Sequence, residues 1–365
     1  MQDSEAELDE YHRIEDLEND LEALAEAQHL AATASSPYVR ALAKAQEVRR
    51  ARSAGRQQLA VVAGAELLQL IDEYLAGGVP RERPSDCGDL ANGLSNAIAS
   101  ALDLPEVSFE AIDALIDELE KVLLAFNYKP YDAWMKRARR YYTSGDQERM
   151  HEQIRALLPH VNYSNGTREL LGCPNCVLDS VVWFMGPEID PELAYETLRP
   201  VLEGEERYPG EDPKYFAQLK RYNQIGRCSS IKHCHMRYGR VLFYAGRTQD
   251  AHEHVMRADP YESPEVFLMP MVIRLEYALA ADDRHELEWW AQELEERMLI
   301  HEDIDEAFQA ALRVAQAFER LGEEPARIGK ALEHAQAYAR RLDARLGEPR
   351  YANWLARERE LGPPF

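Results

Sequence analysis

Apolar residues recur along most of this chain at intervals of three and four, the spacing that places them on one face of an α-helix. Leucine, alanine, glutamate and arginine dominate these segments. β-Branched residues, which lose side-chain freedom in a helix, are scarce. No segment has the alternation of apolar and polar residues that is typical of half-buried strands. The pattern predicts an all-α fold.

Residues 1–128 are predicted to form a helical N-terminal domain that begins with a helical hairpin. An apolar seam runs along the first 30 residues and consists of Ile14, Leu17, Leu21 and Leu24. A second long helix is expected to follow Pro37 and to run toward Leu75. Its basic stretch, Lys44–Arg56, is expected to face the acidic first helix. The seam packs on its own domain or pairs with another helix, so self-association through the N-terminal helices stays open.

Two shorter helices are predicted in the rest of this domain. They span about Leu90–Leu102 and Phe109–Phe126, and Ser108 is placed to cap the second one. The glycine and proline content of Val79–Pro84 predicts a linker before them.

From residue 129 onward the chain reads as pairs of helices separated by glycine-containing turns. In the first pair, Gly145 follows an aromatic and small-residue pattern made of Trp134, Ala138 and Tyr141. In a later pair, small residues fall at 7-5-7 spacing, at Gly239, Gly246, Ala251 and Ala258. Small residues at such positions let two helices approach closely. Further pairs are predicted at 264–280 with 285–299, and at 306–321 with 325–346.

This spacing resembles that of tetratricopeptide repeats, over residues of about 131–346. The resemblance implies an α-solenoid, a right-handed superhelix of antiparallel helix pairs whose concave face binds extended or helical peptides. The second domain is therefore predicted at 129–365. The proline- and glycine-rich segment near 186–230 is an insertion into the repeat period.

The resemblance also implies which side chains line the concave face, because the first helix of each pair lines it. Carried over to the two matched units, these positions are Met135, Arg139, Tyr142, Met236, Arg240 and Phe243. Arginines flanked by Tyr and Met suit an acidic peptide with an apolar anchor. The alternative is that the two arginines pair with acidic residues of neighbouring helices.

The sharpest chemical signal is a set of potential metal ligands. Cys173 and Cys176 have C-x2-C spacing, and Cys228 with His233 forms a second pair. Three thiolates and one imidazole are an established tetrahedral zinc set. The helix pairing places Cys176 at the start of one helix and His233 near the start of another, so adjacent units could bring the ligands together. The sequence predicts a structural zinc ion.

Other interpretations of the cysteines stay open. Cys234 and His235 are alternative ligands to His233. The Cys-Pro-Asn-Cys motif is also typical of a thiol redox pair, although that motif normally follows a β-strand. The cysteines could also be unrelated to one another. Cys87 is expected to be an ordinary loop thiol.

Charge and targeting signals limit the classes of function. The 365-residue chain has a formal net charge of -23, which argues against a general nucleic-acid binder. The longest apolar stretch, Leu59–Ile71, contains Glu66 and is too short to cross a membrane, so a cytoplasmic location is expected. The common nucleotide-binding and nucleophile motifs are absent from the sequence.

These observations together predict an adaptor protein that binds a protein or peptide partner. The alternatives are a zinc- or thiol-dependent enzyme or redox sensor centred on Cys173 and Cys176, and an immunity-type protein that neutralises a basic partner.

Overall fold

The computed structural model describes residues 2–76, 84–160, 174–186, 189–202, 230–257 and 268–363. The chain divides into two compact units, Met1–Thr143 (unit 1) and Ser144–Phe365 (unit 2), and each is described by itself. The sequence-based boundary, between residues 128 and 129, assigns the helix Tyr131–Ser144 to the second domain, whereas the structure groups nearly all of that helix with unit 1.

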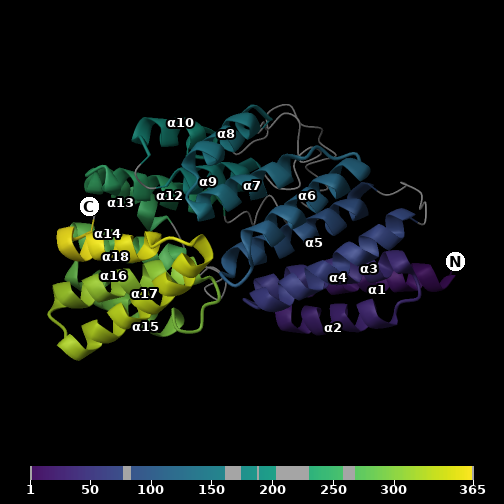
Figure 1. Cartoon of the computed structure of the whole chain (residues 1–365), viewed down its shortest axis with the longest axis horizontal. Helices are drawn as coiled ribbons and strands as arrows, with labels where there is room; N and C mark the ends of the chain where they lie inside the picture. Colours follow the sequence, from purple (N-terminus) through teal and green to yellow (C-terminus); the bar gives the residue numbers. More distant parts are fainter. Residues whose placement is uncertain are drawn as a thin grey trace. The chain divides into compact units, whose positions relative to one another are not determined.

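The described residues confirm the all-α prediction, since they form helices and turns and include no strand (Figure 1). The helices of unit 1 are α1 (Gln2–Glu15), α2 (Asp20–Thr33), α3 (Pro37–Ser53), α4 (Gln57–Ala76), α5 (Pro84–Asp103), α6 (Phe109–Ala125) and α7 (Tyr131–Ser144). Helix α6 begins where predicted, because the Ser108 side chain accepts a hydrogen bond from the backbone N–H of Ala111.

Two long helices predicted in unit 1 are each broken in two. The side chain of Asn19 accepts hydrogen bonds from the backbone N–H groups of Leu21 and Glu22, which starts α2 and separates it from α1. The predicted seam is therefore divided, and Leu21 is 53% exposed. Gly55, with φ of 72°, ends α3 in a left-handed turn, and the N–H of Arg56 reaches back to the carbonyl of Ala51.

The predicted packing of residues 1–30 against the basic stretch Lys44–Arg56 is confirmed. Helices α1 and α2 both pack on α3. The Arg50 guanidinium donates to the carbonyl oxygens of Ile14, Glu15 and Leu17 and to the carboxylate of Asp20. These carbonyls lie at the C-terminal end of α1, where backbone acceptors lack helical partners and the helix dipole is negative. One arginine thus closes the end of α1 and joins it to α2.

Replacing Arg50 with alanine is expected to lower the free energy of unfolding of unit 1 by about 1.5–3 kcal/mol, the range for hydrogen bonds made by a charged group. Arg49→Ala is the matched control, because Arg49 makes one longer contact to Glu15, at 3.5 Å. The control should cost less than about 1 kcal/mol. Urea denaturation of both variants measures the difference, and equal losses would contradict the role given to Arg50.

Unit 2 contains the remaining helices. They are α8 (Gln147–Leu157), the short 3-10 helix η1 (Leu158–His160), α9 (Pro174–Met185), α10 (Pro191–Leu202), α12 (Ser230–Tyr244), α13 (Thr248–Met256), α14 (Met269–Ala281), α15 (Arg284–Arg297), α16 (Ile304–Leu321), α17 (Pro325–Leu346) and α18 (Arg350–Leu361). The predicted pair of helices at 306–321 and 325–346 matches α16 and α17 closely. Helix α18 was not predicted.

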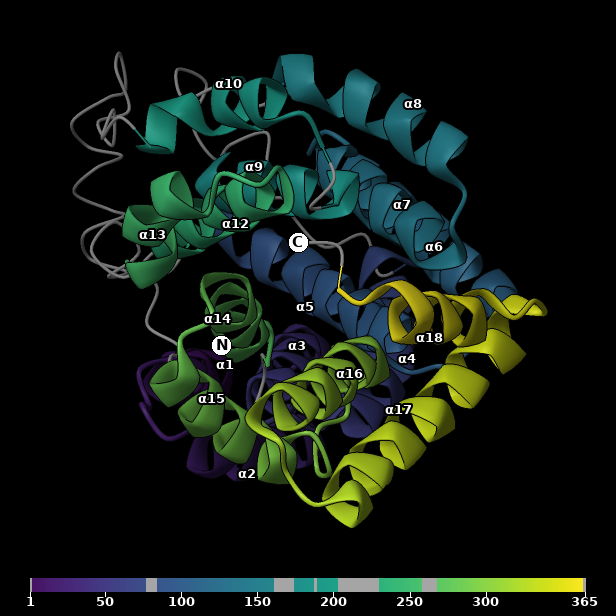
Figure 2. The same cartoon turned by 90° about the vertical axis from the view of Figure 1, so that its left-hand side faces the viewer.

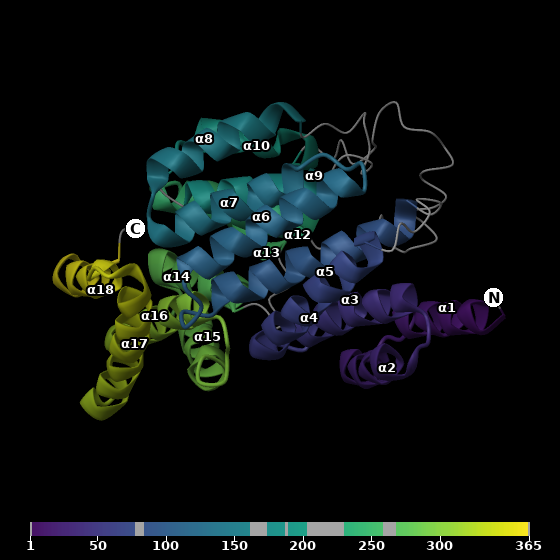
Figure 3. The ribbon, with the colours of Figure 1, turned by 45° about the vertical axis from the view of Figure 1, so that its right-hand side comes forward.

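The helices of unit 2 pack in the order of the sequence. Helices α9, α12, α14 and α16 form one row, in which each contacts the next, and α10, α13 and α15 each contact the row helix that follows them. Helix α18 continues the order after α17, as Figures 2 and 3 show for the C-terminal helices. This nearest-neighbour packing is consistent with a helical array.

The α12–α13 pair shows why its small residues are needed. A Cβ atom added to Gly239 would lie 2.7 Å from the Val255 Cγ2 atom of α13, so only glycine permits this approach. Gly246 turns the chain between the helices with a φ of +76°, and Ala251 is fully buried. The predicted close approach is confirmed at Gly239, while Gly246 forms the turn between the two helices. Ala258 lies outside the described residues.

Candidate functional site

Two of the four predicted zinc ligands, Cys176 and His233, lie in the first turns of two helices of unit 2. Helix α9 begins at Pro174, next to Cys173, and α12 begins at Ser230, three residues before His233. The predicted helix starts are therefore confirmed. Cys173 and Cys228 lie outside the described residues, as does the side chain of Cys176. The side chain of His233 is half-buried on the first turn of α12.

Contacts between α9 and α12 fix how these two helix starts relate. Arg237 of α12 forms an ion pair with Asp179 of α9, with 3.4 Å between Nε and Oδ1. One turn further along α9, the ring of Trp183 lies beneath the guanidinium of Arg237, 3.9 Å from the ring centre, and beneath that of Arg240, the next of these residues along α12, at 5.5 Å. The contacts advance in the same direction on both helices, so the two helices run parallel.

The ligand positions on α9 and α12 lie about one helical turn before the residues of this ion pair. Residues three or four apart share a face of a helix. Position 176 lies three residues before Asp179, and position 233 lies four residues before Arg237. Positions 176 and 233 thus both lie in the first turn of their helices, at the same end of the α9–α12 pair.

The alternative ligands near His233 are engaged elsewhere. His235 Nδ1 lies 2.9 Å from Nδ1 of His254, and its Nε2 lies 3.1 Å from the Arg257 guanidinium. Burial, together with the positive charge of Arg257, lowers the pKa of His235 to about 4. The neutral ring accepts at Nε2 from Arg257 and so donates from Nδ1 to His254. Cys234 is completely buried.

The described residues contain no group of three or more histidine, cysteine, aspartate or glutamate side chains placed to hold a metal ion. Three of the four predicted ligand side chains lie outside that part of the chain. The zinc site therefore stays a prediction.

The residues predicted to bind a partner make internal contacts in this structure. Met236, Arg240 and Phe243 are buried in unit 2, and Met135 is buried in unit 1. Tyr142 is half-buried. Arg139 forms an ion pair with Asp103 of α5. Both predicted arginines thus pair with acidic residues of neighbouring helices, which was the alternative, and their role toward a partner stays a prediction.

Arg240 belongs to a row of alternating buried charges that crosses unit 2. Its guanidinium makes two hydrogen bonds, of 2.8 and 2.9 Å, to Glu276 of α14. Glu276 also accepts from Arg313 of α16, at 2.9 Å, and Arg313 reaches Glu358 of α18. We call Arg240, Glu276, Arg313 and Glu358 the buried ladder. Tyr244 adds a hydroxyl that donates to Glu276 and accepts from Arg313.

The electrostatics of the buried ladder favour an ionised Glu276. Burial alone would raise the pKa of Glu276, but Arg240 and Arg313 together hold that pKa below its ordinary value. Successive ladder residues are 36, 37 and 45 positions apart in sequence. The ladder therefore joins α12, α14, α16 and α18, one side chain from each.

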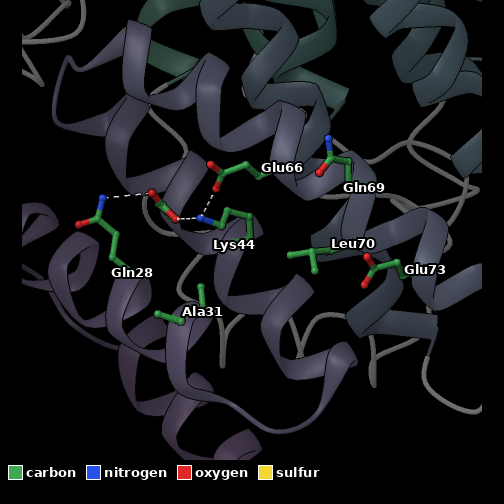
Figure 4. A pocket seen from close by; sticks show the side chains of 9 residues that line it. Gln28, Ala31, Lys44, Glu66, Gln69, Leu70 and Glu73 are labelled. Atoms are coloured by element: carbon green, nitrogen blue, oxygen red, sulfur yellow. Dashed lines mark hydrogen bonds and ion pairs between the residues drawn. The ribbon is translucent and has the colours of Figure 1, made fainter.

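Unit 1 contains a groove that the sequence did not predict (Figure 4). It has a volume of about 470 Å³ and lies between α2 and α4, with α3 as its floor. We call it the α2–α4 groove. The residues that line it are Gln28, Ala31, Ala32, Lys44, Glu47, Glu66, Gln69, Leu70 and Glu73. The only hint in the sequence is the pair of alanines, whose small side chains leave the space open.

In the described ranges, no helix combines the length and the apolarity that crossing a bilayer requires. Comparison with known proteins identifies no relative: no family model matches the chain, and no curated protein is similar to it in sequence.

Proposed function

We propose that the chain is a binding scaffold, a tetratricopeptide-like helical array in which a zinc ion joins the starts of two row helices. The observation that carries the proposal is the packing order of unit 2, where each row helix contacts the next. Such arrays are stabilised by contacts between neighbours, and they present long surfaces suited to proteins or peptides. The glycine-mediated approach of α12 and α13 supports the same architecture.

The α9–α12 geometry supports the zinc part of the proposal. The ion pair between Asp179 and Arg237 joins the two helices about one turn beyond positions 176 and 233, which supports a shared site at that end. Cys173 directly precedes α9, and Cys228 is two residues before α12, so both are within chain reach of that end. His233 suits the fourth position better than His235, because both ring nitrogens of His235 already have partners.

The chemistry of this donor set fits a structural ion. Zinc held by three thiolates and one imidazole is a closed set without an open coordination position. It would close the long segment between residues 176 and 228 into a loop, which reduces the conformational freedom of the unfolded chain.

A thiol redox role is the second candidate, and one observation favours it. Pro174 is the first residue of α9, so the Cys-Pro-Asn-Cys motif coincides with a helix N-terminus. Backbone N–H groups and the helix dipole stabilise a thiolate there. Redox chemistry predicts a reversible Cys173–Cys176 disulfide, whereas the zinc site predicts that both thiols are metal-bound.

Binding is tested with the full chain under reducing conditions. The immobilised protein is expected to retain a protein from its source cells that, once purified, forms a complex of fixed stoichiometry by light scattering. Glu276→Ala, which removes the centre of the buried ladder, should weaken this complex. The exposed Glu288→Ala on α15 should leave it unchanged. A wild-type chain that forms no complex with any retained protein would overturn the binding function.

A further inference from the structure

The α2–α4 groove has the form of an incomplete helical bundle. Helix α3 runs antiparallel to both of its neighbours, so α2 and α4 run parallel on either side of it. Gln28 of α2 reaches across to Glu47 on the floor, and Lys44 of the floor reaches Glu66 of α4. Figure 4 shows Gln28, Lys44 and Glu66 with the interactions that join them, and Leu70 and Glu73 further along α4. Side chains of a further helix laid over α2 and α4 would enter this space.

Apolar positions flank this polar centre. Val62 of α4 is 58% exposed and lies one turn before Glu66, and Leu70 lies one turn after it. Val62 and Leu70 are therefore two turns apart on one face, about 12 Å at 1.5 Å per residue. Across the groove, Ala31 and Ala32 of α2 leave room beside Leu70.

The charge of the groove selects the occupant. Lys44 is the only cation among the lining residues, and its ammonium group is held by Glu47 at 2.6 Å and by Glu66 at 2.7 Å. The lining therefore has an excess of carboxylates. Glu73 is exposed on the rim, two turns beyond Glu66. A second copy of the acidic N-terminal helices would be repelled, whereas lysine or arginine side chains would be attracted.

We infer that the α2–α4 groove binds an amphipathic helix of a partner protein, with apolar side chains two turns apart and lysine or arginine residues beside them. This inference rests on the proposed binding function and names the chemistry of its partner. Apolar residues of the partner helix contact Val62 and Leu70, while its cations face Glu66 and Glu73.

The test uses two synthetic helical peptides of about 18 residues, long enough to form several turns. One carries leucine on one face with lysine flanks, and the other has the same leucines with glutamate flanks. Fluorescence anisotropy with the full chain should show binding of the lysine peptide only. Higher salt should weaken that binding, because screening acts on partly exposed charge pairs.

Two variants and one control locate the binding. Ala32→Trp fills the groove, and Glu73→Lys reverses a rim charge. Each is expected to lower the affinity for the lysine peptide about tenfold, equivalent to about 1.4 kcal/mol of binding free energy. Glu5→Lys makes the same charge change on an exposed position of α1 and should leave affinity within about twofold. Equal affinity for both peptides, or equal effects of Glu73→Lys and Glu5→Lys, would overturn the inference.

Two further outcomes separate this inference from the proposed function. A purified cellular partner that binds Ala32→Trp and Glu73→Lys as tightly as it binds wild type would refute the groove while leaving the scaffold function in place. If the chain forms a dimer and Ala32→Trp dissociates it, the occupant of the groove is a second copy of the chain, which would overturn the basic-helix inference.

Discussion

Replacing Glu276 with alanine is expected to lower the free energy of unfolding of unit 2 by about 3–5 kcal/mol, the range for removing one partner from a buried ion pair. The carboxylate of Glu276 is fully buried and is shared by Arg240 and Arg313. Without this carboxylate, the hydrogen bonds that remain to Arg240 are one of 3.3 Å to Gln309 and one to the sulfur of Met269. Urea denaturation followed by circular dichroism measures the loss.

The matched control is Glu288→Ala, which changes the same residue type at an exposed position of α15. It should cost less than about 0.5 kcal/mol. The double variant Arg240→Met with Glu276→Leu should recover part of the loss, because it removes opposite charges together and leaves Arg313 paired with Glu358. If Glu276→Ala is no more costly than Glu288→Ala, the buried ladder does not stabilise the array.

Replacing Cys176 with serine is expected to lower zinc affinity by more than about a hundredfold, since even changes to residues that only orient metal ligands cost about 10–100-fold. A serine hydroxyl does not supply the thiolate that the site requires. Loss of the ion should speed hydrogen exchange at the starts of α9 and α12. Helices α15, α16 and α17 should stay protected, because they pack mainly on one another and on α14 and α18 rather than on α9.

Histidine variants identify the fourth ligand. His233→Ala should lose zinc, whereas the exposed His285→Ala should retain about one zinc ion per chain, the stoichiometry of one four-ligand site. His235→Ala should also retain zinc, although it removes the contacts with His254 and Arg257. If His233→Ala retains zinc and His235→Ala loses it, His235 rather than His233 is the fourth ligand. Zinc binding should also weaken as pH falls, because thiolate ligands then become protonated.

The sequence predicts those features of the fold that depend on local pattern. Ser108 starts α6 and Gly239 permits the close packing of α12 on α13, because capping and small-residue spacing act over a few neighbours. The breaks at Asn19 and Gly55 were missed. The apolar period continues across both positions. A single capping side chain at Asn19 and one left-handed residue at Gly55 nevertheless interrupt the helix.

The buried ladder could not be predicted in the same way. Charged residues on an amphipathic helix are normally solvent-exposed, and the burial of Arg313 and Glu276 depends on partners 36 or more positions away. Helix α18 was missed for a related reason, since Glu358 acquires its role only through contact with α16. The α2–α4 groove is a space between helices, and helix periodicity does not encode its size.

X-ray absorption at the zinc edge tests the proposed zinc-joined array most directly. The sample is the full chain, purified under reducing conditions without a metal-affinity column. The expected result is about one zinc per chain with three sulfur neighbours near 2.3 Å and one nitrogen neighbour at about 2.0–2.1 Å, the usual distances for such ligands. Reduced protein that contains no zinc, and that forms a reversible Cys173–Cys176 disulfide instead, would contradict the zinc joint and favour the redox role.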